Sequence, residues 1–326
     1  MSNFWKNLPK PIMALAPMCG VTDMPFRLIC KENGADVVYT EMTMVQGLAR
    51  HNEKTLELAA ISKDEQPVVI QLGGNDPEHF YKAAQIIKEL GPAGIDINLG
   101  CPAKKIAGQG SGVALLRDLE RSYQIIQATI EGAGGLPVSI KTRTQIKSAD
   151  KSTTNTSLDL LDKIKDLPVA CIMIHGRSFE APWIEKVDYD YIKSVKEKFS
   201  GIVLANGGIY EPEIAKDVLE KTGADGVGIG HGVYGRPWIF QQIKDYLETG
   251  TYSNWNWKEK KALAIKHAEL AFKLKGHRGL IEYRKQLLWY VKGLPGATDY
   301  RQKLVQLETL ADIKEGLNKI NPEPIE

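Results

Sequence analysis

The sequence has few cysteines and few histidines. Its 326 residues include four cysteines, Cys19, Cys30, Cys101 and Cys171, and six histidines. No two cysteines have the C-x-x-C spacing and no histidine cluster lies beside them. This argues against structural zinc, iron–sulfur clusters and a disulfide framework, and we expect no metal site. Unpaired cysteines are typical of proteins that work in a reducing cytoplasm.

Long apolar runs and a strong charge imbalance are also missing. No apolar segment approaches the roughly 20 residues that a membrane-spanning helix needs, so we expect no membrane partner. Lysine and arginine total 42 against 40 for aspartate and glutamate, which gives a net charge of +2. Binding to a nucleic acid would therefore need a local patch of cations. The hydrophobic content of 43% is that of an ordinary globular protein.

Strand-like and helix-like segments alternate up to residue 249. Short apolar runs predict parallel strands covered on both faces, at 12–16, 36–40, 68–72, 94–99, 138–142, 170–174, 202–205 and 226–229. Amphipathic segments predict helices between them, at 25–33, 76–90, 118–131, 157–166, 188–199, 211–222 and 237–248. This α/β order has the size of a (β/α)8 TIM barrel. A doubly wound sheet is the alternative, disfavoured because no G-x-G-x-x-G follows the first strand.

The pattern changes after Thr251. Segments 255–275, 281–292 and 302–319 have helical periodicity, contain many lysines and arginines, and are not separated by strands. We therefore predict two domains, a barrel domain of residues 1–249 and a small all-α helical domain of residues 250–326. A lysine-rich helix is usually just a solvated surface, so the basic character alone does not establish an RNA-binding role.

One stretch carries the strongest candidate for chemistry. The strand predicted at 94–99 ends in Gly100-Cys101-Pro102, and Lys104, Lys105 and a glycine-spaced loop follow. In (β/α)8 barrels the catalytic side chains lie at the carboxyl ends of the strands, which is where this thiol falls. A free cysteine at a strand end can equally be an inert, half-buried residue. The residues at the ends of the other strands are needed to choose between a catalytic and an inert Cys101.

The strands end in polar groups that would share the same barrel mouth. They are Met18-Cys19, Glu41, Gln71, Asn98, Lys141 with Arg143, and His175 with Arg177. No carboxylate pair is among them, which argues against glycoside hydrolysis. A lysine in such a mouth suits an anion or an electron-rich ring, and Gln71 suits the edge of a heterocycle such as a flavin. The last two strands end in glycine-rich turns, 206–208 and 230–232, which suit a phosphate on free backbone N–H groups.

Longer motifs surround these residues. They are APMCGVTDMPFR at 16–27, VIQLGG at 69–74, DINLGCPAKK at 96–105, IKTR at 140–143, IHGR at 174–177, ANGGI at 205–209, GRPWIF at 235–240 and YRKQLLWYVKGLPGA at 283–297. Together they resemble the tRNA-dihydrouridine synthases, and most of all the bacterial DusB-like branch. Two departures from the family pattern matter: His231 replaces the usual arginine, and the loop AGQGSG at 107–112 lacks the additional basic residues that relatives commonly have. Cys19 also replaces the commoner alanine.

The resemblance implies an FMN-containing barrel with a helical RNA-binding domain. The implied reaction reduces the 5,6 double bond of uridine in tRNA with NAD(P)H, the hydride passing from FMN to carbon 6 and the proton from Cys101 to carbon 5. The matching FMN-binding positions are Pro17, Met18, Cys19, Gln71, Lys141, His175, Asn206, Gly207, Gly208, Gly230 and His231. The expected contacts to substrate or RNA are Asn98, Lys104, Lys105, Arg143, Arg177, Arg284, Lys285 and Lys292.

Three other functions stay open at this point. The chain could act on ribosomal RNA, it could be an FMN barrel reductase of a small molecule, or it could be a non-enzymatic RNA-binding protein on a decayed barrel. The basic helical segments argue against the small-molecule alternative, and the presence of the thiol, lysine and histidine argues against the decayed barrel. The family interpretation further predicts a cytoplasmic monomer.

Overall fold

The parallel strands close into a barrel. The computed structural model describes residues 3–181 and 184–322. Its barrel strands are β1 (Ile12–Leu15), β2 (Val37–Tyr39), β4 (Val68–Gly73), β5 (Gly94–Leu99), β6 (Val138–Arg143), β9 (Val169–His175), β10 (Ile202–Asn206) and β11 (Gly226–Ile229). Strand β11 pairs with β1, and a pairing between β2 and β4 completes the closure. The predicted (β/α)8 barrel is confirmed, and every predicted strand is present.

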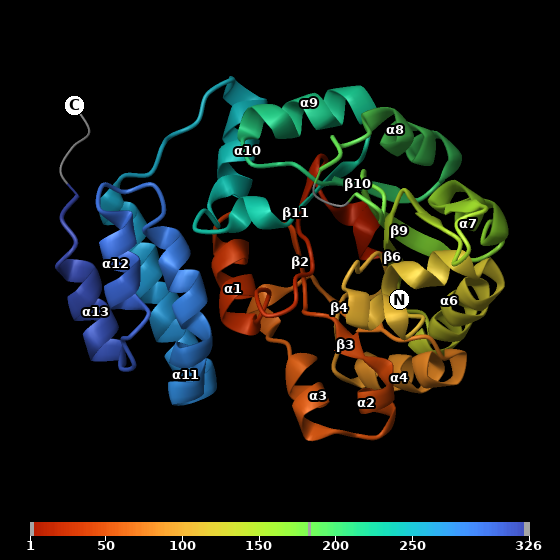
Figure 1. The fold of residues 1–326 in the computed structure, drawn as a ribbon, viewed down its shortest axis with the longest axis horizontal. Helices are drawn as coiled ribbons and strands as arrows, with labels where there is room; N and C mark the ends of the chain where they lie inside the picture. The colour runs from red at the N-terminus through yellow and green to blue at the C-terminus, as the bar shows by residue number, and fades with distance from the viewer. Residues whose placement is uncertain (1–2, 182–183, 323–326) are drawn as a thin grey trace.

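Helices cover the outside of the barrel (Figure 1). They are α1 (Met24–Glu32), α4 (Pro77–Glu89), α6 (Leu119–Ala133), α7 (Ser157–Lys163), α8 (Tyr189–Lys198), α9 (Pro212–Thr222) and α10 (Ile239–Thr249). Several begin at an aspartate whose carboxylate accepts a hydrogen bond from a backbone N–H of the first turn, as Asp23, Asp76, Asp118 and Asp188 do. Such caps satisfy N–H groups that have no partner inside the helix, and they explain why these helices could be located from the sequence.

Several short elements were not predicted. Between β2 and β4 lie β3 (Thr43–Met44), α2 (Val45–Ala49), α3 (Glu53–Leu58) and the 3-10 turn η2 (Lys63–Glu65), and the hairpin β7 (Gln145–Lys147) with β8 (Thr154–Thr156) follows β6. The glycine-spaced loop predicted after Cys101 is in fact helix α5 (Lys104–Gly108) followed by the 3-10 helix η3 (Gly112–Arg117). Elements of so few residues contain too little of a periodic pattern to be recognised.

The carboxyl-terminal helices gather at one side of the barrel, nearest to α1 and α10 (Figure 1). Helix α11 (Trp257–Tyr290) joins the predicted segments 255–275 and 281–292 across a kink at Gly276, where φ is 60° and ψ is −146°. The prediction of a single helix at 302–319 was wrong, because two helices lie there, α12 (Ala297–Leu304) and α13 (Leu310–Asn318). Thr309 starts α13 by accepting a hydrogen bond from the backbone N–H of Asp312.

The helical region packs firmly on the barrel. Its apolar core includes Ile29 of α1 and Trp238, which precedes α10. Two aromatic stacks span the junction: Trp238 on Trp255 with ring centroids 4.3 Å apart, and Tyr234 on Trp289 at 4.0 Å. These contacts fix where α11 lies relative to the barrel strands. Within residues 3–181 and 184–322, no helix is both long enough and apolar enough to cross a bilayer.

A buried ion pair ties α1 to the segment that leads into β4. The Arg27 Nε–H donates to Glu65 Oε2 at 2.5 Å, and its Nη2–H donates to Glu65 Oε1 at 3.0 Å. Further N–H groups of Arg27 donate to the backbone oxygens of Thr22 and Ala60. Both charged side chains are almost completely buried. Removing one partner therefore leaves a charge in the interior without compensation.

We expect Arg27→Ala to lower the free energy of unfolding by about 3–5 kcal/mol, because the Glu65 carboxylate would remain buried and unpaired. Arg278→Ala is the matched control, since Arg278 pairs with Glu57 and Glu282 at an exposed position and should cost less than about 1 kcal/mol. Denaturant unfolding followed by circular dichroism measures both. Equal losses in the two variants would contradict the structural role of the buried pair.

Candidate functional site

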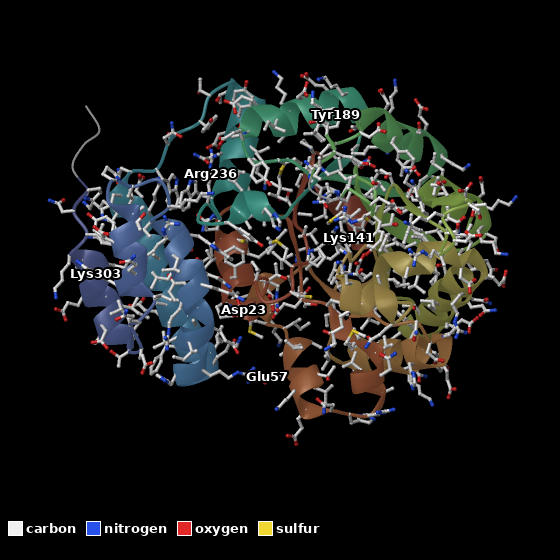
Figure 2. All side chains as sticks on the ribbon, in the orientation of Figure 1. Asp23, Glu57, Lys141, Tyr189, Arg236 and Lys303 are labelled. Carbon is white, nitrogen blue, oxygen red and sulfur yellow. The ribbon has the colours of Figure 1, made fainter. Side chains whose placement is uncertain are left out.

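A cavity of about 260 Å³ opens at the carboxyl ends of the barrel strands. Figure 2 places Lys141 within the barrel, while Asp23 and Glu57 lie toward α11. Many of the residues singled out in the sequence line this cavity together, namely Pro17, Met18, Cys19, Gln71, Asn98, Cys101, Lys141, Arg143, His175, Arg177, Asn206, Gly207, Gly208, Gly230 and His231. Glu41 lies instead in a neighbouring cleft between the barrel and α11, where it accepts a hydrogen bond from the Gly20 N–H.

The polar side chains of β4 and β5 form one hydrogen-bonded group at the cavity floor. The Asn98 Nδ2–H donates to Gln71 Oε1 at 2.9 Å, and the Gln71 Nε2–H donates to Asp96 Oδ2 at 2.8 Å. Asp96 is fully buried and also accepts from the Ser139 hydroxyl at 2.7 Å. Burial raises the pKa of Asp96 to about 6, against the hydrogen bonds and the nearby charge of Lys141, which lower it. The sequence analysis did not single out Asp96, although it shares the inward face of its strand with Asn98.

Two cations approach the floor from β6. Burial lowers the pKa of Lys141 to about 8, with Arg143 adding to the effect, and the Lys141 ammonium donates to Asn206 Oδ1 at 3.2 Å. No described carboxylate lies within ion-pair distance of Lys141, so a negatively polarised ligand would be a favourable partner. Arg143 donates to the backbone oxygens of Gly100 and Ser178 at 3.0 and 3.3 Å. The bond to Gly100 holds the loop that contains Cys101 against β6.

The strands β9, β10 and β11 supply a histidine and a glycine-lined wall. Burial and the charges of Lys141, Arg143 and Arg177 lower the pKa of His175 to about 2, so its ring is neutral at physiological pH. The buried Nδ1 of His175 has no hydrogen-bond partner in the described part of the chain. At Gly207, φ is 116°, a conformation that favours glycine. A Cβ built on Gly230 would meet only Met18 Sδ, at 3.6 Å, so that backbone is open to a ligand.

The thiol of Cys101 is half-buried at the edge of this cavity. The Cys101 N–H donates to Asn98 Oδ1 at 2.8 Å, which joins the loop to the polar group below. Gly112 packs so closely on this residue that an added Cβ would lie 2.9 Å from the Cys101 oxygen. Cys19 lines the same cavity, and burial raises the pKa of its thiol. Cys30 and Cys171 are buried in the core.

The donor set fits FMN. A tricyclic ring with carbonyl and ring-nitrogen edges needs polar side chains as partners, and Gln71, Lys141 and His175, whose Nδ1 has no described partner, line the cavity. A phosphate needs free backbone N–H groups and cations, and the glycine-lined wall with Arg177 and His231 lines the same cavity. The described residues contain no group of three or more His, Cys, Asp or Glu side chains that could hold a metal ion.

The other predicted RNA contacts lie outside the cavity. Lys104 and Lys105 are exposed on α5, immediately after the Cys101 loop. Lys285 is exposed on α11, and its ammonium lies 2.7 Å from the position of a Cβ built on Gly20. Lys292 is exposed just beyond α11. Arg284 donates to the backbone oxygen of Val305 and to Glu308, so its guanidinium is engaged within the helical region.

One aromatic residue at the mouth was missed. Tyr210 lines the cavity and is 49% exposed. Its backbone oxygen accepts a hydrogen bond from Arg236 at 3.1 Å. Tyr210 directly follows the motif at 205–209. The sequence signal that could have identified it is an aromatic residue one position beyond a turn predicted to bind a ligand.

Comparison with known proteins identifies the family of this chain. The family model described as dihydrouridine synthase matches residues 14–323. The chain belongs to the dihydrouridine synthase family. A probable tRNA-dihydrouridine synthase of Rickettsia conorii is 36% identical over 299 residues, covering 88% of this chain and 86% of the relative. The tRNA-dihydrouridine synthase B of Pseudomonas syringae pathovar tomato is also 36% identical, over 91% of this chain and 87% of the relative. The resemblance stated from the motifs, the B branch included, is confirmed.

More distant solved structures share the barrel. A structure of morphinone reductase in complex with tetrahydroNAD has a TM-score of 0.52 and 12% sequence identity, and covers 79% of this chain and 92% of that chain. At this identity the likeness concerns the fold only.

We expect Lys141→Met to stabilise the ligand-free protein at pH 7. The pKa of Lys141 is lower in the folded protein, at about 8, than its ordinary 10.5. The charged form therefore costs folding free energy below pH 8, and this cost disappears as the pH rises above 10.5. The variant should gain roughly 1–3 kcal/mol at pH 7, with the gain shrinking at higher pH. Denaturant unfolding at several pH values measures this.

The exposed Lys292 provides the control for that experiment. Lys292→Met should change the stability by less than about 0.5 kcal/mol at every pH, since surface substitutions rarely do more. A Lys141→Met variant that is less stable than the parent protein at pH 7, with a deficit independent of pH, would show that the buried charge is not costly.

Proposed function

We propose that this chain is an FMN-dependent tRNA-dihydrouridine synthase, which reduces the 5,6 double bond of uridine in tRNA with NAD(P)H as the reductant. The observation that carries the proposal is the single cavity in which the Cys101 thiol meets donors suited to a heterocycle and to a phosphate. Membership of the dihydrouridine synthase family and relatives named as acting on tRNA support the same reaction.

The side chains of the floor would hold the flavin ring, and the glycine-lined wall would hold its phosphate. Gln71, Lys141 and His175 face the ring in this arrangement, and the Lys141 ammonium opposes negative charge on it. Bound FMN supplies the hydride for carbon 6 of the base. Pro17, Met18 and Cys19 after β1, and Asn206 after β10, complete the lining. The backbone at Gly207, Gly208 and Gly230, with His231 and Arg177, provides the anion-binding end.

Cys101 would donate the proton that carbon 5 needs. Reduction at carbon 6 leaves negative charge delocalised over carbon 5 and the carbonyl at carbon 4, so an acid must stand on the opposite face of the base. Thiols ordinarily have a pKa of about 8.5 and are protonated at neutral pH, yet transfer the proton readily. Asn98, which also lines the cavity, provides an amide beside this position, and nearby cations stabilise the developing charge.

The uridine has to leave the folded tRNA to reach this cavity. Extruding a base costs a few kcal/mol, which contacts to the phosphate backbone must offset. Lys104 and Lys105 beside the Cys101 loop, and Lys285 and Lys292 of the helical region, are the exposed cations for that role. Because the helical region packs beside the mouth, one tRNA could contact both surfaces. A small-molecule substrate would need none of these exposed lysines.

The cellular setting follows from the substrate. The four cysteines form no disulfide, and tRNA and NAD(P)H are available in the cytoplasm, so we place the activity there. We also propose that one chain acts as a monomer, since one cavity contains the whole candidate site. Light scattering of the purified protein tests that statement directly.

We expect Cys101→Ala to retain FMN and its reduction by NADPH, and to lose dihydrouridine formation by at least about 100-fold, because the proton donor is missing. Mass analysis of nucleosides after incubation with unmodified tRNA measures the product, and flavin absorbance measures the reduction step. Full activity in this variant would refute the acid role.

Nucleoside analysis of transfer and ribosomal RNA from a deletion strain identifies the natural substrate. Dihydrouridine missing only from ribosomal RNA would overturn the tRNA assignment.

The exposed lysines of α5 give a second test. We expect Lys104→Ala/Lys105→Ala to weaken tRNA binding and to lower the slope of log K against log salt by about 1.4–1.8, since each phosphate contact contributes about 0.7–0.9. Filter binding over a series of salt concentrations measures the slope. Lys216→Ala/Lys221→Ala is the matched control, because these α9 lysines pair with Glu220 and Asp217. An identical slope in both double variants would remove α5 from the RNA interface.

A further inference from the structure

Asp96 lies directly beneath the candidate site and is not explained by it. Its side chain is fully buried and does not line the cavity. The barrel register places it between Gln71 on β4 and Ser139 on β6. Asn98 follows two residues later on the same face of β5. A carboxylate at this depth is costly unless hydrogen bonds compensate it, and Gln71 and Ser139 provide those bonds.

The hydrogen bonds above Asp96 can run in only one direction. The backbone N–H groups of Gly100 and Cys101 donate to Asn98 Oδ1, at 3.1 and 2.8 Å. Asn98 must therefore use its Nδ2–H toward Gln71 Oε1, and Gln71 must use its Nε2–H toward Asp96. An amide has one donating and one accepting end. A flip of either amide would set two donors or two acceptors against each other.

We propose that Asp96 is a positioning residue for the Cys101 thiol. As an acceptor at the lower end of this relay, it fixes the orientation of the Gln71 and Asn98 amides. The Asn98 oxygen in turn holds the backbone of Gly100 and Cys101, so the thiol stays at the edge of the cavity. The relevance to proton donation rests on the proposed function, whereas the relay itself does not depend on the identity of the substrate.

Two substitutions separate the acceptor from the charge. Asp96→Asn keeps an oxygen toward Gln71 and turns its amino group toward the Ser139 hydroxyl, which can accept a hydrogen bond. The relay survives although the negative charge is lost. Asp96→Leu has a similar shape but no acceptor, so Gln71 loses its fixed partner. Ser139→Ala is the matched control, because it removes the other contact of Asp96 and leaves the relay intact.

Because the chain has only four cysteines, the backbone amide of Cys101 can be followed by NMR. Full-length protein labelled with ¹⁵N only at cysteine gives amide signals for Cys19, Cys30, Cys101 and Cys171. We expect Asp96→Leu to speed hydrogen–deuterium exchange of the Cys101 amide about tenfold, the equivalent of one hydrogen bond. The Cys30 amide in α1 should stay at its parent rate. Asp96→Asn and Ser139→Ala should leave the Cys101 rate within about twofold of the parent value.

Coupling to Asn98 completes the test. Asn98→Ala removes the oxygen that accepts the hydrogen bond from the Cys101 N–H. Adding Asp96→Leu to this variant should therefore cause no further increase in the exchange rate of that amide. If Asp96→Leu does not fold, Gln71→Leu breaks the relay one step higher and should give the same tenfold effect. An unchanged Cys101 rate in the leucine variant would overturn the proposal. Equal rates in the asparagine and leucine variants would also overturn it, because the charge would then matter and the acceptor would not.

The exchange measurement needs neither RNA nor flavin, so its failure is separate from a failure of the proposed function. A second measurement links the relay to the reaction. In the holoenzyme, Asp96→Leu should lower kcat for dihydrouridine formation about tenfold or more, and Asp96→Asn should restore it. A loss of kcat without any change at the Cys101 amide would show that Asp96 acts through a route other than the loop, and would overturn the relay.

Discussion

The parallel register of the closed barrel is the constraint on which the rest of the structure depends. All eight barrel strands run in the same direction, so their carboxyl ends meet at one rim. Residues far apart in the chain, such as Gln71 and Lys141, are then separated only by β5. A single antiparallel strand would send its polar end to the opposite rim. The cavity, its charges and its thiol all follow from this geometry.

The rim concentrates groups that would be unfavourable elsewhere. Lys141, Arg143 and Asp96 are charged or titratable groups in a largely dry environment, and their pKa values are shifted by burial. Hydrogen bonds to backbone oxygens and amides hold them in place, and no described carboxylate forms an ion pair with Lys141. A protein that maximised stability alone would replace such groups with apolar side chains. Buried polar groups with shifted pKa values, gathered at one rim, indicate a ligand site.

The helical region completes the surface around that rim. Aromatic stacking at its junction with the barrel, together with the bond from the Gln286 Nε2–H to the Val21 oxygen, holds α11 beside the loop that follows β1. The loop carries Met18 and Cys19 into the cavity. A substrate that contacts α11 is therefore directed toward the cavity and not to another face of the barrel. Ion pairs of α11 with Glu32, Asp23 and Glu57 add to these contacts, and the combination suits a fixed arrangement.

The sequence by itself determined the barrel, its strand order and most of the cavity lining, because apolar strand cores, aspartate caps and glycine stops are local signals. The rim residues followed from one rule about parallel strands. The sequence did not determine the short elements between β2 and β4 or the division of 302–319 into α12 and α13, since these have too few residues for a periodic pattern.

Only the tertiary structure decided which polar residues meet. Asp96 reads as one polar residue in an alternating strand, and its role depends on hydrogen bonds to Gln71 and Ser139 on two other strands. Arg284 and Lys285 are adjacent in sequence, yet Arg284 is engaged by Glu308 and Lys285 is exposed beside Gly20. Such pairings depend on distances between segments remote in the chain, and the spacing of residues along one segment contains no information about them.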